Sequence, residues 1–230
     1  MKKAILIQLS AMFCLASLAS AQALQVVRIQ TDDPAGYLAW ADQSASALLG
    51  DNEGSVATCV PRFGAEDGVD AYFVSAGPNM AALLSLDLNG PVVQRETAKV
   101  AALRTVVARD VFVTLKAGSA RQAGDRWSQM VLMSETSQPA RYVELLGEQE
   151  RALHENGFDD VSWQVHAINT GDYSGLIHAA LSAPTGQRLG EALDAVSTAS
   201  WSNFARGEFN ELRTIVRNMV IDCSMHASNR

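Results

Sequence analysis

The amino-acid sequence predicts an α+β fold built from two β-α-β-β-α-β repeats that close into one barrel. The frame T-x-x-P-A-x-Y occurs at 31–37 and again at 136–142. The frame L-R-T-[VI]-V follows in the same order, at 103–107 and at 212–216. Between these landmarks both halves show the same succession of strand and helix patterns. Ordered matches at nearly constant spacing indicate an internal duplication.

A secretory signal peptide is expected over residues 1–23. Two lysines precede the apolar run 4–18, and small residues follow, with cleavage expected after Ala21 or Ala23. The run is short for a membrane span, so an N-terminal anchor is the less favoured alternative. We therefore expect a periplasmic or secreted protein that has no membrane association after cleavage.

The charge balance limits the partners. The formal net charge is −7, and loss of a leader that holds two lysines and no acid makes it −9. An acidic surplus opposes binding to nucleic acid and to anionic lipid. The expected partner is therefore a small molecule or a protein. Because two repeats in one chain can cover each other's sheets, a monomer is plausible.

The first repeat is expected over 24–116. Asp33 and Pro34 are typical of a helix start, and Gly50 of a helix end. Runs of β-branched residues indicate the strands, and spacing near 3.6 indicates the helices. In chain order we expect a strand at 24–30, the helix that starts at Pro34, a hairpin of strands at 56–63 and 69–75, helical segments at 80–88 and 92–102, and a strand at 106–115.

A polar, Gly-containing stretch without periodicity, 117–126, is expected to link the repeats. The second repeat, 127–230, follows the order of the first, and Asn156-Gly157 marks the end of its first helix. Its expected elements are a strand at 127–135, a helix at 139–155, a hairpin of strands at 161–169 and 175–181, a helix at 185–204, a lead-in at 208–213 and a strand at about 215–223.

A β-α-β-β-α-β unit covers one face of its sheet with helices and leaves the other face bare. Two such units can bury their bare faces against each other and form an eight-stranded barrel. This arrangement resembles the dimeric α/β-barrel superfamily, with both ferredoxin-like protomers fused in one chain. The resemblance spans nearly all of the mature chain. Its members include monooxygenases that need no cofactor, haem-handling enzymes and stress-response proteins, so it implies a fold more than a function.

Two cysteines, Cys59 and Cys223, remain after the expected cleavage. An even count in an exported chain favours a disulfide, and two buried free thiols are the alternative. The barrel topology gives an independent reason for the bridge. Cys59 belongs to the second strand of one repeat and Cys223 to the last strand of the other, and these strands can meet at a seam.

The sequence contains no dinucleotide-binding glycine motif, no P-loop, no zinc-protease helix and no nucleophile elbow. The strand near 161–168 alternates, which turns Trp163 toward the helices and Gln164 and His166 into the barrel. A hairpin centred on Asp172 would then place His178 opposite His166. Such a pair could bind a metal, hold a haem or carry a proton, and the alternative is two buried, hydrogen-bonded histidines.

Tyr37 and Tyr142 occupy equivalent positions one turn into the first helix of each repeat. Together with Trp163 they are expected in the core, and a role as pocket wall is the alternative. Arg104 and Arg213 also match between the repeats, and a structural pairing near a helix end explains them most simply.

The functional expectation is an exported binding protein for a small molecule or a protein, without catalysis that the motifs identify. Catalytic residues and a cofactor are not assigned, although haem or a metal is compatible with the histidine pair. The alternative, which the superfamily resemblance implies, is a cofactor-independent monooxygenase-like or haem-handling enzyme of the dimeric α/β-barrel type.

Overall fold

The computed structural model describes residues 22–229, so the predicted signal peptide lies almost entirely outside the described part. The first half has the predicted order of strands and helices. Its elements are β1 (Ala23–Gln30), α1 (Pro34–Leu49), β2 (Gly54–Phe63), β3 (Ala71–Gly77), α2 (Met80–Leu84), α3 (Pro91–Ala98), the 3₁₀ turn η1 (Ala101–Leu103) and β4 (Thr105–Lys116). Asp33 caps α1 as expected, since its Oδ1 accepts a hydrogen bond from the backbone N–H of Gly36 at 2.9 Å.

The described part of the second half has the same order of strands and again has three α-helices and one 3₁₀ turn. Its elements are β5 (Arg126–Glu135), α4 (Pro139–Glu155), β6 (Ser162–Thr170), β7 (Ile177–Ala183), α5 (Gly186–Thr198), the 3₁₀ turn η2 (Ser200–Ser202), α6 (Asn203–Leu212) and β8 (Thr214–Asn229). The prediction of one helix over 185–204 followed by an irregular lead-in was wrong. The Ser202 hydroxyl donates to Val196 O at 2.6 Å and to Ala199 O at 2.8 Å, which stabilises a turn after α5.

Helix α6 has an apolar stripe that the lead-in prediction overlooked. Ala205, Phe209 and Leu212 are buried with α4 residues in one core, at the i, i+4, i+7 spacing of a helix face. β8 is also longer than predicted and continues to Asn229.

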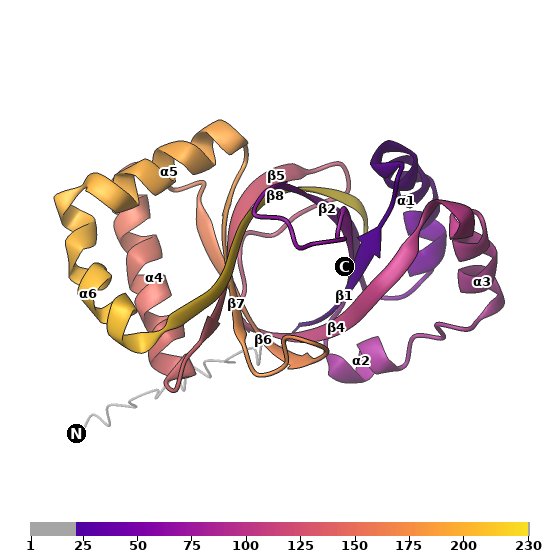
Figure 1. The fold of residues 1–230 in the computed structure, drawn as a ribbon, viewed down its shortest axis with the longest axis horizontal. Coiled ribbons are helices and arrows are strands. Elements are labelled where there is room, and N and C mark those ends of the chain that lie inside the picture. The colour runs from indigo at the N-terminus through magenta and orange to yellow at the C-terminus, as the bar shows by residue number, and fades with distance from the viewer. Residues whose placement is uncertain (1–21, 230) are drawn as a thin grey trace, which may run out of the picture.

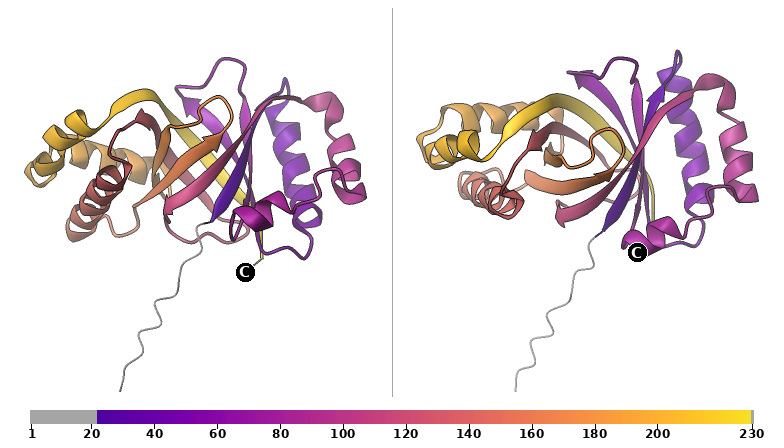
Figure 2. Two further views of the ribbon diagram at one scale, coloured as in Figure 1. Left: turned by 90° about the horizontal axis from the view of Figure 1, so that it is seen from below. Right: turned by 60° about the horizontal axis from the view of Figure 1, so that its bottom comes forward.

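The eight strands form a closed antiparallel barrel in the order β1-β3-β2-β8-β5-β7-β6-β4 (Figure 1). Each half supplies four adjacent strands, and the halves join where β2 pairs with β8 and where β4 pairs with β6. Helices of the first half pack on one side of the barrel and helices of the second half on the opposite side, as the views in Figure 2 also show. The predicted α+β barrel is therefore confirmed.

Strand alternation separates an outer core from an inner one. Val27 and Ile29 of β1 pack outward against Tyr37 and Trp40 of α1. Leu24 of the same strand faces inward, beside Phe112 of β4. Because successive side chains of a strand point to opposite faces, each strand contributes to both cores. Among the described helices, none has the length and apolar character required to cross a membrane.

The predicted disulfide is confirmed. Cys59 of β2 and Cys223 of β8 are direct partners in the register of one seam, and their sulfurs are bonded at 2.00 Å. The bridge closes a loop with a sequence separation of 164 residues. It ties the first half to the last strand of the second.

Reduction of this bridge is expected to lower the free energy of unfolding by about 5 kcal/mol, because a loop of this length restricts the unfolded chain strongly. Urea unfolding of the mature protein with and without reductant measures the difference. A C59A/C223A variant should be indifferent to the reductant. Labelling of both thiols in the folded, unreduced protein would contradict the assignment.

Candidate functional site

The barrel interior contains a cavity of about 420 Å³ that opens at the end where β4 stops and β5 begins. The apolar part of its lining comes mainly from strands of the first half. These side chains are Leu24, Val26, Val74, Ala76 and Phe112, together with Ile221 of β8. An enclosed apolar space with few polar groups is typical of sites for small organic ligands.

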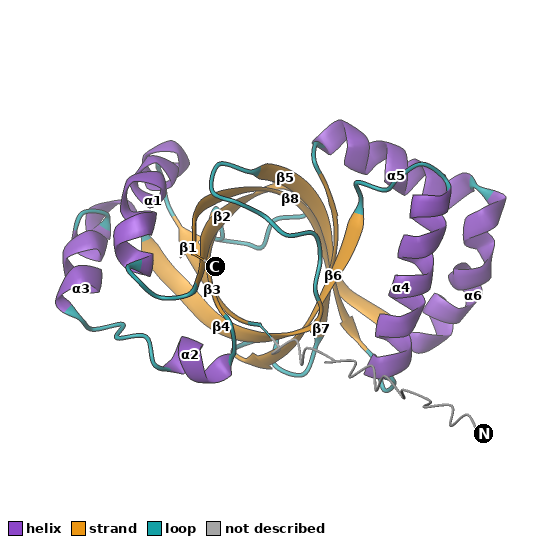
Figure 3. Cartoon of the chain, turned by 180° about the vertical axis from the view of Figure 1, so that it is seen from behind, coloured by secondary structure: helices purple, strands orange, loops and turns teal. Residues whose placement is uncertain are grey.

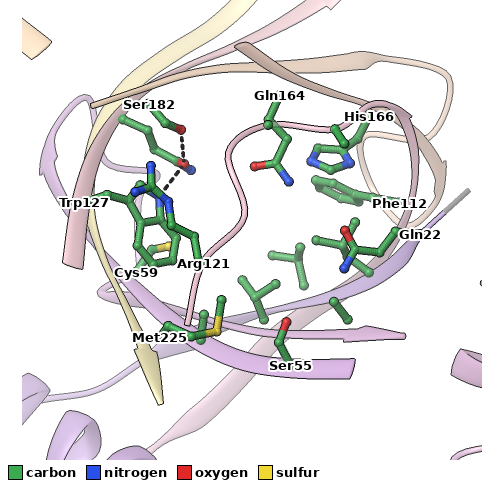
Figure 4. A pocket seen from close by; sticks show the side chains of 18 of the residues that line it. Gln22, Ser55, Cys59, Phe112, Arg121, Trp127, Gln164, His166, Ser182 and Met225 are labelled. Atoms are coloured by element: carbon green, nitrogen blue, oxygen red, sulfur yellow. Dashed lines mark hydrogen bonds between the residues drawn. The ribbon is translucent and has the colours of Figure 1, made fainter. Parts of the chain in front are cut away.

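Much of the polar lining lies on the β5, β6 and β7 wall, and Gln22 and Ser55 add polar groups on the opposite side. Ser182 and Gln129 are nearest the mouth, Gln164 follows, and His166 and His178 lie deeper. Ser182 and His178 are four residues apart on β7, which corresponds to roughly 13 Å along the strand. Figure 4 shows Gln164 and His166 pointing into the same space as Phe112. The β5, β6 and β7 wall is therefore the more polar one, and the opposite wall is mainly apolar.

The two histidines face each other as predicted. They are register partners on β6 and β7, and their ring centroids are 5.5 Å apart. Phe112 lies against both rings, with centroids 6.1 Å from His166 and 5.2 Å from His178. Nδ1 of His166 is 3.1 Å from the Thr114 hydroxyl, whereas Nδ1 of His178 is buried without a hydrogen-bond partner in the described part of the chain.

Burial keeps both imidazoles neutral. Desolvation lowers the pKa of His178 to about 4. Desolvation, and secondarily the neighbouring His178, holds the pKa of His166 well below its usual range. At neutral pH each ring therefore retains one nitrogen with a lone pair that can accept a proton.

The segment 117–125 crosses the mouth of the barrel (Figure 3). At one end the Ser119 hydroxyl is 2.9 Å from the hydroxyl of Ser162. At the other end Gly124 N–H donates to Met225 O at 2.8 Å. Between these anchors the Arg121 guanidinium lies over the Trp127 ring, 5.3 Å from its centroid. The stretch predicted only as a linker thus forms part of the cavity wall.

Buried charges fill the opposite end of the barrel. Arg28 pairs with Glu66 at 3.0 Å, with Asp110 at 3.1 Å and with Asp172 at 2.5 Å. Arg28, Glu66 and Asp110 are all buried, and the Tyr173 hydroxyl donates to Glu66 at 2.8 Å. Loss of Arg28 would leave the buried carboxylates of Glu66 and Asp110 without this compensating charge. The cluster closes this end, so the cavity has its mouth at the other.

Three of the singled-out residues lie outside the cavity. Tyr37 is fully buried under α1, and Tyr142 and Trp163 are buried in the outer core of the second half. The Trp163 indole donates to Gln149 Oε1 at 3.0 Å, and Arg213 donates to the Tyr142 hydroxyl. Their expected place in the core is confirmed.

Sequence reasoning missed most of the cavity lining, including four residues on which the site depends. Gln129 and Trp127 alternate in phase along β5, so the same argument that found Gln164 could have found them. Phe112 follows the same rule on β4. Arg121 belongs to a segment without periodicity, and no local pattern predicted its position.

The donor set does not suit a haem or a metal ion. Within residues 22–229 no group of three or more His, Cys, Asp and Glu side chains is arranged to hold a metal. Phe112 lies against both histidine rings, where a haem plane would need open space. His154 is not an alternative ligand in the cavity, because it lies on α4 over the filled outer core. Its Nε2 is hydrogen-bonded to Val161 O at 2.8 Å.

Comparison with known proteins adds evidence on the fold. No protein-family model and no curated protein sequence matches the chain. Solved structures do match. A candidate monooxygenase from Lactobacillus acidophilus aligns with a TM-score of 0.60 and 12% identity, over 91% of this chain and 97% of that one. A candidate monooxygenase from Fusobacterium nucleatum gives 0.59 and 8%, over 90% and 93%, and an anthrone oxidase-like protein gives 0.54 and 10%, over 92% and 97%.

These structures are dimeric α/β-barrel proteins, and at such low identity they establish the fold that the sequence predicted. They also correct the functional expectation. A non-catalytic binding protein was predicted, but the solved chains that share the barrel over nearly its whole length are described as candidate monooxygenases and an anthrone oxidase-like protein. The enzyme alternative is therefore the better supported one.

The histidine pair is expected to make stability depend on pH. The folded-state pKa of His178, about 4, is below the unfolded value near 6.5. The stabilisation from the neutral ring is therefore complete above pH 6.5 and is lost as pH falls toward 4, by roughly 3 kcal/mol. Urea unfolding of wild type and His178→Gln at pH 7, 5.5 and 4 measures it. Parallel pH profiles would contradict the buried neutral state, and His154→Gln is the matched control.

Proposed function

We propose that this protein is an oxygenase or oxidase that acts on a flat, mostly apolar substrate inside the barrel without a resident cofactor. One observation carries the proposal. Nδ1 of His178 is buried beside the cavity without a hydrogen-bond partner among the described residues, and the ring is neutral. Buried polar atoms normally have partners, so an orphaned one in a cavity marks a place for a substrate atom.

The chemistry that fits is proton removal from a substrate with an acidic C–H group. His178 takes the proton, and the C–H electron pair stays on carbon as a carbanion. The carbanion is oxidised by O₂, a C–O bond forms, and the resulting peroxide takes up a proton. Loss of water from this hydroperoxide leaves a carbonyl. One O₂ thus converts a CH₂ group to C=O and yields one water.

The cavity walls support this assignment. A positioned base contributes typically 10²–10⁴-fold to a rate. Phe112 and the apolar wall can pack against an aromatic ring system. On the opposite wall the Gln129 carboxamide oxygen accepts from Trp127 Nε1 at 2.9 Å and from the Ser182 hydroxyl at 3.2 Å. Its amino group therefore remains a donor, and with Gln164 it can bind an oxygen that gains negative charge.

The histidine pair gives the proton a defined place. His166 lies beside His178 and contacts Thr114, so the pair can share the proton while O₂ reacts. A lone buried imidazolium is costly, but a carbanion next to it offsets that cost. The proton can then pass to the peroxide oxygen formed on the substrate carbon, which gives the hydroperoxide.

Two further proposals concern the origin and the location of the chain. We propose that the halves arose by duplication, which the repeated frames and the matched arginines support: Arg104 lies over Trp40 and Arg213 over Tyr142. We also propose that the protein works in the periplasm or outside the cell, which the disulfide supports.

Oxygen consumption with anthrone as substrate tests the proposed activity. Wild-type protein should accelerate oxygen uptake and carbonyl formation above the uncatalysed rate. His178→Gln should lower the rate by 10²-fold or more, and His166→Gln by about tenfold or more, because the base and its neighbour are lost. His154→Gln on α4 is the matched control and should keep the wild-type rate.

The proposal fails if wild type does not accelerate oxygen uptake with anthrone or with related hydroxylated naphthalenes. It also fails if both cavity variants keep full activity while they remain folded. Near-ultraviolet circular dichroism and the urea midpoint show whether each variant is folded.

A further inference from the structure

The charge at the mouth of the cavity points to the class of substrate. Of the described side chains that line the cavity, Arg121 is the single one that is cationic at neutral pH, since both histidines are neutral. Figure 4 shows its guanidinium beside Trp127, across the cavity from His166 and Phe112. A cation at one side and a base at the other define an axis along which a substrate can lie.

The surroundings of Arg121 favour an anion. Its side chain is half-buried between the mouth segment and the Trp127 ring. Burial lowers the pKa of Arg121, and the attraction of Asp125 raises it. An anion in the mouth would add a favourable interaction with the guanidinium in a partly dry place. Glu53, the carboxylate in the cavity lining, is exposed at the rim, where water screens its charge.

We infer that the natural substrate is an aromatic molecule with one carboxylate or similar anionic group, which Arg121 binds at the mouth while the apolar rings extend toward the histidine pair. Guanidinium and carboxylate match in shape and can form two parallel hydrogen bonds. The anion holds the molecule in one orientation, so its far end lies at His178. This inference rests on the proposed function, because it takes the barrel interior as the reaction site.

A pair of probes that differ only in charge tests the inference. 1-Anilino-8-naphthalenesulfonate is an anionic aromatic, and N-phenyl-1-naphthylamine has the same rings without the sulfonate. Fluorescence titration of the mature protein should show the sulfonate binding about tenfold more tightly than the neutral probe. Arg121→Gln should weaken sulfonate binding about tenfold and leave the neutral probe within twofold.

Three variants control the result. Arg121→Lys keeps the charge and should retain most of the preference for the sulfonate. Arg151→Gln removes the same charge from the exposed side of α4 and should change neither affinity. Ala76→Phe fills the cavity wall and should weaken both probes by tenfold or more.

Several outcomes overturn the inference. Equal affinities of the wild type for the two probes would do so. Equal weakening of the binding of both probes in Arg121→Gln would also do so, because it would indicate that Arg121 has a structural role in holding the mouth segment. Sulfonate binding that survives in Ala76→Phe would show binding to the outer surface. These titrations involve no turnover. If Arg121 selects the anionic probe but anthrone oxidation is absent, the proposed activity fails and the anion site stands. If anthrone is oxidised but Arg121 does not select the anionic probe, the anion site fails and the proposed activity stands.

Discussion

The structure depends on the mutual burial of two sheet faces that neither half can cover with its own helices. Each half packs its helices on one side of four strands and leaves an inner face that would otherwise meet water. Pairing of β2 with β8 and of β4 with β6 removes the exposed edges as well as the exposed faces. The Cys59–Cys223 bond lies on one of these seams and keeps it closed.

Closure also creates the chemical environment of the interior. The Arg28 cluster fills one end with one guanidinium and the carboxylates that it pairs with, and the other end stays open beneath the segment 117–125. Water access is therefore limited to a single mouth. In this setting desolvation dominates the titration of the histidines, and a neutral base can face an apolar substrate. The barrel wall is thus a structural element and also encloses the cavity.

Much of this could be predicted from local patterns. Alternation along 161–168 turned Gln164 and His166 inward, and the symmetry of the hairpin placed His178 opposite, because antiparallel register follows from the turn. Helix α6 in the second half was harder to predict. Phe209 and Leu212 form a helical stripe of only ten residues, and its stability comes from packing on α4 rather than from the segment itself.

The sequence by itself determined the order of the strands and of most helices, the face on which each strand residue lies, the pairing of Cys59 with Cys223 and the opposed histidines. These properties follow from periodicity within single segments, from hairpin symmetry and, for the cysteines, from their even number and the barrel topology. Only the tertiary structure decided that Phe112 covers both histidines, that Arg121 lies over Trp127 at the mouth, and that Arg28 closes the far end. Such contacts join strands and loops that are distant in the chain. They depend on how all eight strands pack around one interior.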